Sequence, residues 1–289
     1  MFRPAETDIS DEHRWAILQR RAQEVRAVEA FSIMRSYGIE PVLIKGLAAA
    51  YFYPSGQLRM SVDMDLAVSA KDHSLAKQIC FADAAGLAID LHGELRHLDT
   101  VPWPDLFSNS VTVDIDGAPI RFLRPEDHLR VLCLHWLTDG GVYKDRLWDV
   151  YYIVSRRERD FDWDRVFDPV SPRRQRWLKC VLGLAEKYLG LDLDRTPAAG
   201  AAATLPQWLI RTVEKEWSEK VPLIPLGACL GDRKMLFQQF ARRLPPNPIQ
   251  ATIDMEGDFD TRSRLYFQVA SSIRRSLHLS RLSPQRLDL

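Results

Sequence analysis

The sequence predicts an α+β fold in which a small mixed sheet flanked by helices, within residues 1–124, precedes a mainly helical domain, residues 125–289. Three observations support this prediction. Short apolar or alternating segments, which are typical of strands, are confined to the first 124 residues. Helical spacing of apolar residues precedes and separates these segments, and it dominates after Pro125. The length of 289 residues also favours two domains.

The first domain is expected to begin with a long amphipathic helix over residues 11–36, ended near Gly38. Its apolar stripe is expected to contain Trp15, Leu18, Ala22, Val25 and Val28. Strands are expected at residues 41–44, 61–68 and 87–95, and as a hairpin over residues 109–123 that turns at Asp116-Gly117. Shorter helices are expected at residues 47–50 and 71–85, with a turn at residues 53–56.

The second domain is expected to begin with a helix that has Pro125 in its first turn and ends at Gly140-Gly141. Glu126 and Asp127 suit the positive end of the helix dipole. Further helices are expected over residues 145–157, 173–189, 205–219, 234–243 and 262–277. Pro- and Ala-rich connectors are expected over residues 196–204 and 244–248.

The composition is that of an ordinary globular protein, with 39 basic and 39 acidic residues and a formal net charge of zero. No overall field attracts nucleic acid or anionic lipid, so we expect neither as a partner. The 4 cysteines are scattered and read as buried apolar residues of a reducing compartment. Because neither a membrane-length apolar run nor a signal-peptide layout is present, we expect a cytoplasmic protein.

A pair of aspartates carries the clearest chemical signal. Asp63 and Asp65 lead into a buried strand, so their side chains are expected on one face of a rigid element. Two carboxylates on one face are unfavourable unless a cation lies between them, and two divalent ions need a third carboxylate. Asp90 on the next strand is the candidate, with His92 and Glu94 as alternatives on the same face. Similar pairs recur within residues 114–116, 160–164, 192–194 and 258–260, where loops explain them.

Replacing Asp63 or Asp65 by asparagine is therefore expected to abolish turnover and leave the fold intact.

Upstream, Lys45-Gly46 closes the first strand at the start of a helix, where backbone N–H groups favour a phosphate. Arg59 has the planar fork that holds phosphate oxygens. The alternative to a phosphate site is a purely structural role, in which Lys45 lies at a strand end and Arg59 forms a surface ion pair with an aspartate.

These motifs together resemble a known family. The segments that carry the resemblance are Leu43-Ile44-Lys45-Gly46-Leu47-Ala48-Ala49, Tyr53-Pro54, Leu58-Arg59 and Asp63-Met64-Asp65-Leu66-Ala67-Val68. Softer matches follow at Asp90-Leu91-His92, His135-Trp136 and Arg146-Leu147-Trp148-Asp149. In this order they resemble the poorly characterised bacterial nucleotidyltransferases of the polymerase-β superfamily that carry a lysine–glycine turn. The resemblance covers roughly residues 30 to 165. It departs from the wider superfamily at Leu47, where a serine is usual, so Lys45 and the backbone must hold the phosphate there.

The resemblance implies a polymerase-β-like nucleotidyltransferase domain over residues 1–124 and metal-dependent transfer of a nucleotidyl group from an NTP, ATP above all. Asp63, Asp65 and Asp90 would be catalytic and hold Mg²⁺ or Mn²⁺, and Lys45, Gly46 and Arg59 would bind the nucleotide. His92, His135, Lys144, Arg146 and Asp149 become candidates to line the cleft. His128, on the same helix as His135, is expected to be a hydrogen-bonded structural residue.

The acceptor is left open between a small molecule, a sugar and a peptide, at a hydroxyl or a phosphate. Two other functions remain open at this stage. A transferase of the same fold could use a nucleotide-sugar donor, because a metal-bound diphosphate makes the same demands on the two aspartates. A module that binds a nucleotide or a partner without catalysis is the third possibility.

Overall fold

A computed structural model describes the chain except for residues 1–10, 55–56, 58, 60, 62, 220, 222, 225, 230 and 283–289. The chain divides into two compact units. The first comprises the described residues of Met1–Leu132 together with Asp149–Val170. The second comprises Cys133–Trp148 and the described residues of Ser171–Leu289. The predicted boundary between residues 124 and 125 stays a prediction.

The first unit contains a mixed sheet with the strand order β3-β2-β1-β5-β4. Its strands are β1 (Val42–Ile44), β2 (Met64–Val68), β3 (Ile89–Gly93), β4 (Val111–Ile115) and β5 (Ala118–Phe122). The pairs β1–β2 and β4–β5 are antiparallel, whereas β2–β3 and β1–β5 are parallel. The predicted hairpin is confirmed, and both turn residues, Asp116 and Gly117, have positive φ as a tight hairpin turn requires. This sheet and its flanking helices confirm the predicted α+β fold.

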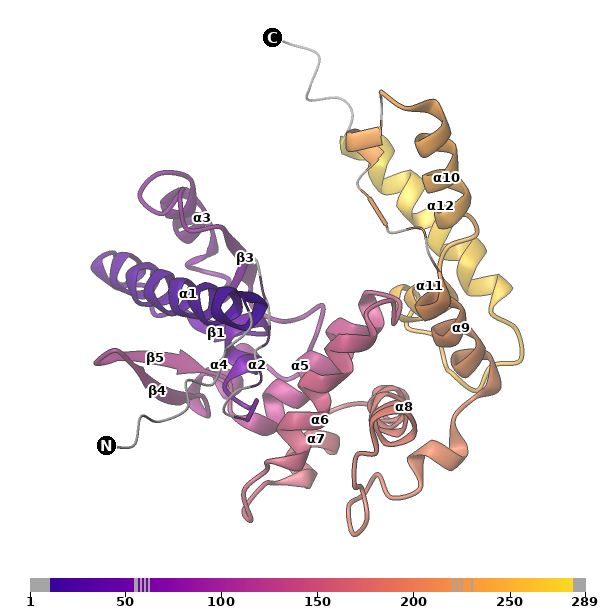
Figure 1. The fold of residues 1–289 in the computed structure, drawn as a ribbon, viewed down its shortest axis with the longest axis horizontal. Coiled ribbons are helices and arrows are strands. Elements are labelled where there is room, and N and C mark those ends of the chain that lie inside the picture. The colour runs from indigo at the N-terminus through magenta and orange to yellow at the C-terminus, as the bar shows by residue number, and fades with distance from the viewer. Residues whose placement is uncertain are drawn as a thin grey trace, which may run out of the picture. The chain divides into compact units, whose positions relative to one another are not determined.

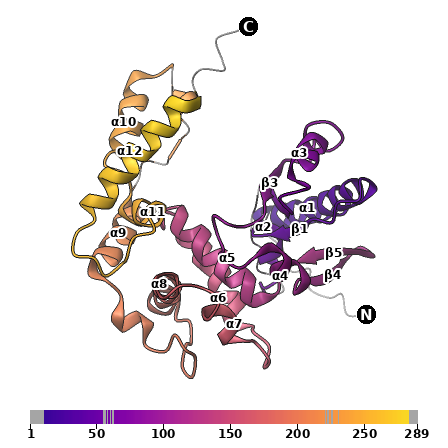
Figure 2. The same cartoon turned by 180° about the vertical axis from the view of Figure 1, so that it is seen from behind.

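Helices cover this sheet and follow it in the chain (Figures 1 and 2). They are α1 (Asp11–Ser36), α2 (Gly46–Ala50), α3 (His73–Phe81), α4 (Trp103–Ser108) and α7 (Trp163–Phe167), with those parts of α5 (Pro125–Thr138) and α6 (Leu147–Ser155) that belong to this unit. The core of the unit forms where α1 and α3 meet one face of the sheet, and Phe31, Met34, Leu43, Leu66 and Ile79 belong to it. The short helices α4 and α7 were not predicted, because segments of five or six residues show too little periodicity.

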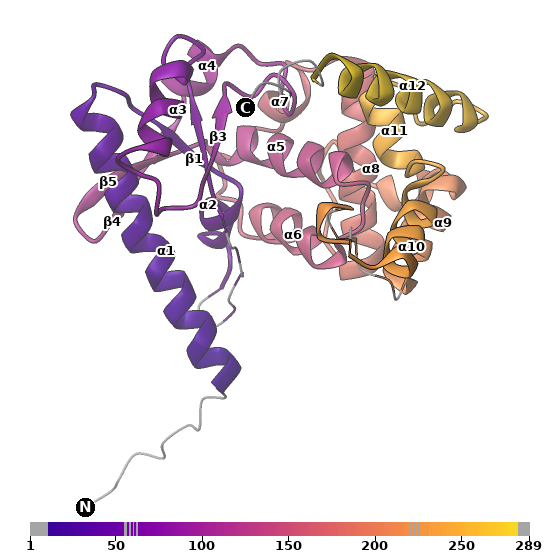
Figure 3. The same cartoon turned by 90° about the horizontal axis from the view of Figure 1, so that it is seen from above.

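The buried face of α1 differs from the prediction. Of the five residues expected in the buried stripe, Trp15 is 60%, Leu18 61% and Val25 50% exposed, and Ala22 is exposed as well. Val28 is partly buried and packs against the core, as predicted. Ala27, Ala30, Phe31 and Met34 are buried instead. Figure 3 shows the reason, since the first turns of α1 extend past the strands and only its second half lies over the sheet.

The second unit is helical. Its remaining elements are α8 (Pro172–Leu189), α9 (Gln207–Ser218), α10 (Arg233–Arg243), α11 (Pro248–Asp254) and α12 (Leu265–Leu282). Short 3₁₀ segments occur at Lys144–Arg146, Ala201–Thr204 and Leu226–Cys229. Helix α11, which was not predicted, packs against both α9 and α12. The Asn247 side chain caps this helix by accepting hydrogen bonds from the N–H groups of Ile249 and Gln250. The last residue of the predicted connector over residues 244–248 is therefore the first residue of α11.

The structure bears only in part on the expected turn and on the absence of a membrane-spanning segment. The turn expected at residues 53–56 falls partly outside the described residues. Within the part of the chain that the structure describes, no helix has both the length and the apolar character needed to cross a bilayer.

Candidate functional site

The site begins where β2 and β3 lie side by side as parallel strands. Asp65 pairs with Asp90 in the register of these strands, as expected for neighbouring ligands. Leu66 and Leu91, the next residue of each strand, pack toward the hydrophobic core. Because side chains alternate along a strand, Asp65, Asp90 and His92 lie on the opposite face. The Asp65 side chain is 8% exposed and that of Asp90 is 53% exposed.

Lys45 places a positive charge directly against Asp65. It follows β1, whose Ile44 pairs with Asp65, and its backbone has a φ of 50°. The Lys45 Nζ lies 2.6 Å from Asp65 Oδ1, and both side chains are buried. Burial by itself would raise the pKa of Asp65, but a hydrogen bond from His92 and the charge of Lys45 hold this pKa below its usual value. The Asp65 carboxylate is therefore ionised at neutral pH.

This ion pair changes the premise of one expectation, which itself stays a prediction. Asparagine at Asp65 was expected to leave the fold intact, since two carboxylates would need a metal between them. The cation beside Asp65 is the Lys45 ammonium, so the carboxylate also supports the folded chain. Removing it would leave a buried, unpaired charge.

His92 completes a group of three possible metal ligands. Its Nε2 lies 3.3 Å from Asp65 Oδ1 and 3.4 Å from Asp90 Oδ2. One ligand atom from each of the three residues lies within 4.8 Å of the others, and no other such group occurs among the residues that the structure describes. Carboxylate oxygen and imidazole nitrogen are common ligands of divalent ions. The donor set therefore fits a divalent metal.

The other carboxylates named from the sequence lie outside this group. Asp63 precedes β2 by one residue and its side chain is exposed. Glu94 accepts hydrogen bonds from the Arg96 side chain and from the Ala70 N–H. Of the two alternatives to Asp90, the structure thus places His92 and not Glu94 beside Asp65.

Gly46 is the first residue of α2 and leaves no room for a side chain. A Cβ at this position would lie 2.9 Å from Ser61 Oγ and 3.6 Å from Asp65 Oδ2. The first distance is shorter than van der Waals contact. Glycine here lets the backbone lie against the segment of Ser61, Asp63 and Asp65 without displacing the Ser61 hydroxyl.

His128 on α5 holds the backbone of the same turn. Its fully buried imidazole accepts the Lys45 N–H at Nε2 over 3.0 Å. Burial, and to a smaller extent the charge of Arg59, lowers the pKa of His128 to about 3. The prediction of a hydrogen-bonded structural histidine is consistent with this contact, but the sequence did not connect His128 with Lys45. Its position in an apolar helical stripe was the available signal, because a buried imidazole needs a partner.

A comparison with known protein families identifies the family of the chain. Residues 3–190 match a family described as uncharacterised nucleotidyltransferase. The chain belongs to this nucleotidyltransferase family. The resemblance inferred from the lysine–glycine turn and the aspartate strand is thereby confirmed, and both motifs lie inside the matched range.

No curated protein is significantly similar to the chain. A crystal structure of an antigenic nucleotidyltransferase-like protein from Paracoccidioides brasiliensis is similar to it with 14% sequence identity and a TM-score of 0.40, over 58% of this chain and 89% of that chain.

Arg59 and Asp149 form a second buried pair in the first unit. Arg59 donates from Nε and Nη2 to the two Asp149 oxygens over 2.8 and 2.9 Å. The Tyr53 hydroxyl also donates to Asp149, over 2.7 Å, and burial together with this carboxylate raises the pKa of Tyr53. The pair joins residues 90 positions apart, so the sequence could not connect them. The Arg59–Asp149 pair is buried, whereas the structural alternative stated from the sequence was an Arg–Asp pair on the surface.

The remaining candidates lie in the second unit. Arg146 contacts both His135 and Asp139, with 3.1 Å between Arg146 Nη1 and His135 Nε2. Lys144 lies over the rings of Trp217 and Tyr188, with its Nζ 5.3 and 6.0 Å from their centroids. Their predicted role as lining residues of the cleft stays a prediction.

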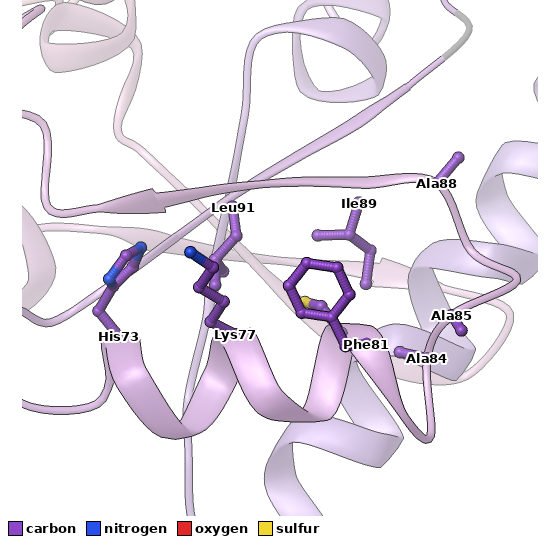
Figure 4. A pocket seen from close by; sticks show the side chains of 9 residues that line it. His73, Lys77, Phe81, Ala84, Ala85, Ala88, Ile89 and Leu91 are labelled. Atoms are coloured by element: carbon purple, nitrogen blue, oxygen red, sulfur yellow. The ribbon is translucent and has the colours of Figure 1, made fainter. Parts of the chain in front are cut away.

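A pocket of about 450 Å³ lies on the other face of β3. Figure 4 shows His73, Lys77 and Phe81 of α3 on one side and Ile89 and Leu91 of β3 on the other. Because Ile89 and Leu91 alternate with Asp90 and His92 along the strand, this pocket and the group of three possible metal ligands lie on opposite faces of the sheet. The pocket is therefore separate from the candidate metal centre.

Proposed function

We propose that the chain transfers a nucleotidyl group from an NTP, with ATP as the first candidate, to a hydroxyl or phosphate of a small-molecule, sugar or peptide acceptor. One observation above all supports this proposal. Asp65 and Asp90 stand opposite each other on neighbouring strands, with Lys45 against Asp65, in a chain of the nucleotidyltransferase family. Anionic ligands for a cation and a cation for a phosphate thus occur in one site.

The proposed reaction is an in-line displacement at the α-phosphorus of the NTP. An acceptor oxygen forms a bond to this phosphorus, the bond to the bridging oxygen of the β-phosphate breaks, and pyrophosphate leaves with that electron pair. When the acceptor is a hydroxyl, its proton passes to water. Mg²⁺ or Mn²⁺, when bound, supplies Lewis-acid stabilisation of the charge on the triphosphate and the acceptor oxygen.

The residues of this chain orient the reacting groups. Asp63, Asp65 and Asp90 are proposed to hold the metal, with Asp63 reaching the site from the exposed segment before β2. Lys45 and Gly46 are proposed to hold phosphates, Lys45 by its charge and Gly46 by leaving the backbone accessible. Arg59 is held by Asp149 in this structure, and its contact with phosphate stays a prediction.

The proposal is tested by incubating the chain with each of the four NTPs, Mg²⁺ or Mn²⁺ and a cell extract, and identifying modified species by mass. A product that gains the mass of a nucleotidyl group is the expected result. A product that gains the mass of a sugar when nucleotide-sugars are supplied would replace this function by glycosyl transfer. Tight metal-dependent nucleotide binding without any product would indicate a binding module instead.

A further inference from the structure

Two carboxylates and an ammonium group surround one ring nitrogen of His92. Three groups lie close to His92 Nε2: Asp65 Oδ1 at 3.3 Å, Asp90 Oδ2 at 3.4 Å and Lys45 Nζ at 3.3 Å. A carboxylate accepts hydrogen bonds, whereas an ammonium group donates them. A proton on Nε2 therefore suits the two carboxylates but faces the ammonium. A lone pair on Nε2 suits the ammonium but faces two carboxylates.

A metal ion would satisfy three of these groups at once, because the lone pair of Nε2 and both carboxylates can bind it. The Lys45 ammonium already marks a cation position beside Asp65 and His92. The proposed function places a nucleotide phosphate against Lys45, and this phosphate would draw the ammonium away from Asp65. The lysine would then exchange one anionic partner for another.

The distances between the ligand atoms also suit a metal. Two ligands that each lie about 2.1 Å from an ion are about 3.0 Å apart at an octahedral angle and about 3.4 Å apart at a tetrahedral angle. The separations of His92 Nε2 from the two carboxylates, 3.3 and 3.4 Å, fall within or at the end of this range. Strand register fixes these positions, because Asp65 and Ala67 of β2 pair with Asp90 and His92 of β3. Once Lys45 has left, the separations of His92 from the two carboxylates already suit an ion.

We propose that His92 Nε2 is a metal ligand together with Asp65 and Asp90, and that the centre therefore prefers Mn²⁺, or another divalent ion that accepts imidazole, over Mg²⁺. The preference follows from ligand chemistry, because imidazole suits transition metals and Mg²⁺ is bound mainly by oxygen. This inference rests on the proposed function and names its metal. A centre built only of aspartates would show a weaker preference of this kind.

The test uses the full chain with Mn²⁺ and inorganic triphosphate, a probe that contains no nitrogen. Pulsed electron paramagnetic resonance measures the coupling of Mn²⁺ to nitrogen, and growth with ¹⁵N-histidine identifies whether that nitrogen belongs to a histidine. The expected result is the coupling of a directly bonded imidazole, with the isotope shift. This measurement on the unaltered chain does not depend on the folding of any variant.

Two variants identify the histidine. His92→Gln should remove the coupling and lower the preference for Mn²⁺ over Mg²⁺ in a competition titration by about tenfold or more. His97→Gln is the matched control, because the His97 ring stacks on His92 with a centroid distance of 5.2 Å but is not among the three ligands. It should keep the coupling.

Three other results would overturn the inference in distinguishable ways. Bound Mn²⁺ without nitrogen coupling would exclude His92 as a ligand and leave the proposed nucleotidyl transfer standing. Coupling that persists in His92→Gln would assign the nitrogen to another residue. No Mn²⁺ binding with triphosphate present would contradict both this inference and the metal-dependent function.

Discussion

His128 makes the stability of the chain depend on pH, and this dependence tests how the lysine–glycine turn is held. The imidazole accepts the Lys45 N–H at Nε2, so a proton added there removes this hydrogen bond. Its folded-state pKa is about 3, whereas an unperturbed histidine has a pKa of about 6.5. Between these two values the unfolded chain binds the proton and the folded chain does not. The stabilisation is therefore fully present above about pH 6.5 and is lost as the pH falls toward 3.

The size of the effect follows from the same two pKa values. Each pH unit below about 6.5 removes about 1.4 kcal/mol, so about 2 kcal/mol is lost at about pH 5. His128→Gln keeps a neutral hydrogen-bonding group but cannot titrate. Urea unfolding of both proteins at about pH 7.5 and pH 5 should therefore show a loss that is about 2 kcal/mol larger in the wild type. Any constant cost of the substitution cancels in this comparison. Equal losses in the two proteins would refute the assignment of a neutral, buried His128.

Three substitutions test other contacts of the site. Asp65→Asn should lower the free energy of unfolding by about 3–5 kcal/mol, because it leaves a buried lysine unpaired; a variant as stable as the wild type would show that this ion pair is unimportant. Gly46→Ala should weaken NTP binding, measured by calorimetry, and lower the free energy of unfolding in urea by about 1–3 kcal/mol. Gly86→Ala is the control and should change neither quantity, because a Cβ there would meet nothing within 4 Å. Equal NTP affinity and equal stability of the two variants would contradict this. Arg59→Lys should destabilise the chain by about 1–3 kcal/mol since lysine cannot form both hydrogen bonds to Asp149, and a double-mutant cycle with Asp149→Asn that gives no coupling energy would contradict this.

The strands and the acidic pair were accessible from the sequence because local patterns determine them. Short apolar segments gave β1 and β2, and the alternation after Leu87 gave β3 with Asp90 and His92 on one face. The register of these two parallel strands, which the structure shows, brings Asp65 and Asp90 opposite each other. The family resemblance rested on the order of these same local motifs.

The partners of the charged residues could not be predicted, because they depend on distant parts of the chain. Helical spacing is present both at Trp15 and Leu18 and at Ala27 and Phe31, and only the position of the sheet decides which face of α1 is buried. The contact of His128 with Lys45 crosses 83 residues. The positive φ of Lys45, which accompanies its contact with Asp65, could not be predicted either. A lysine before a glycine does not by itself indicate this backbone conformation.

The most direct test of nucleotidyl transfer follows the individual phosphates of the NTP. The full chain is incubated with a divalent metal, cell extract and ATP labelled on either the α- or the γ-phosphate, alongside Asp90→Asn and the exposed control Asp160→Asn. We expect the α-label to become attached to an acceptor, the γ-label to leave in pyrophosphate, and Asp90→Asn alone to lose the transfer. Attachment of the γ-label would indicate phosphoryl transfer, and α-label transfer by Asp90→Asn at the wild-type rate would show that the carboxylates of β2 and β3 do not form the catalytic centre.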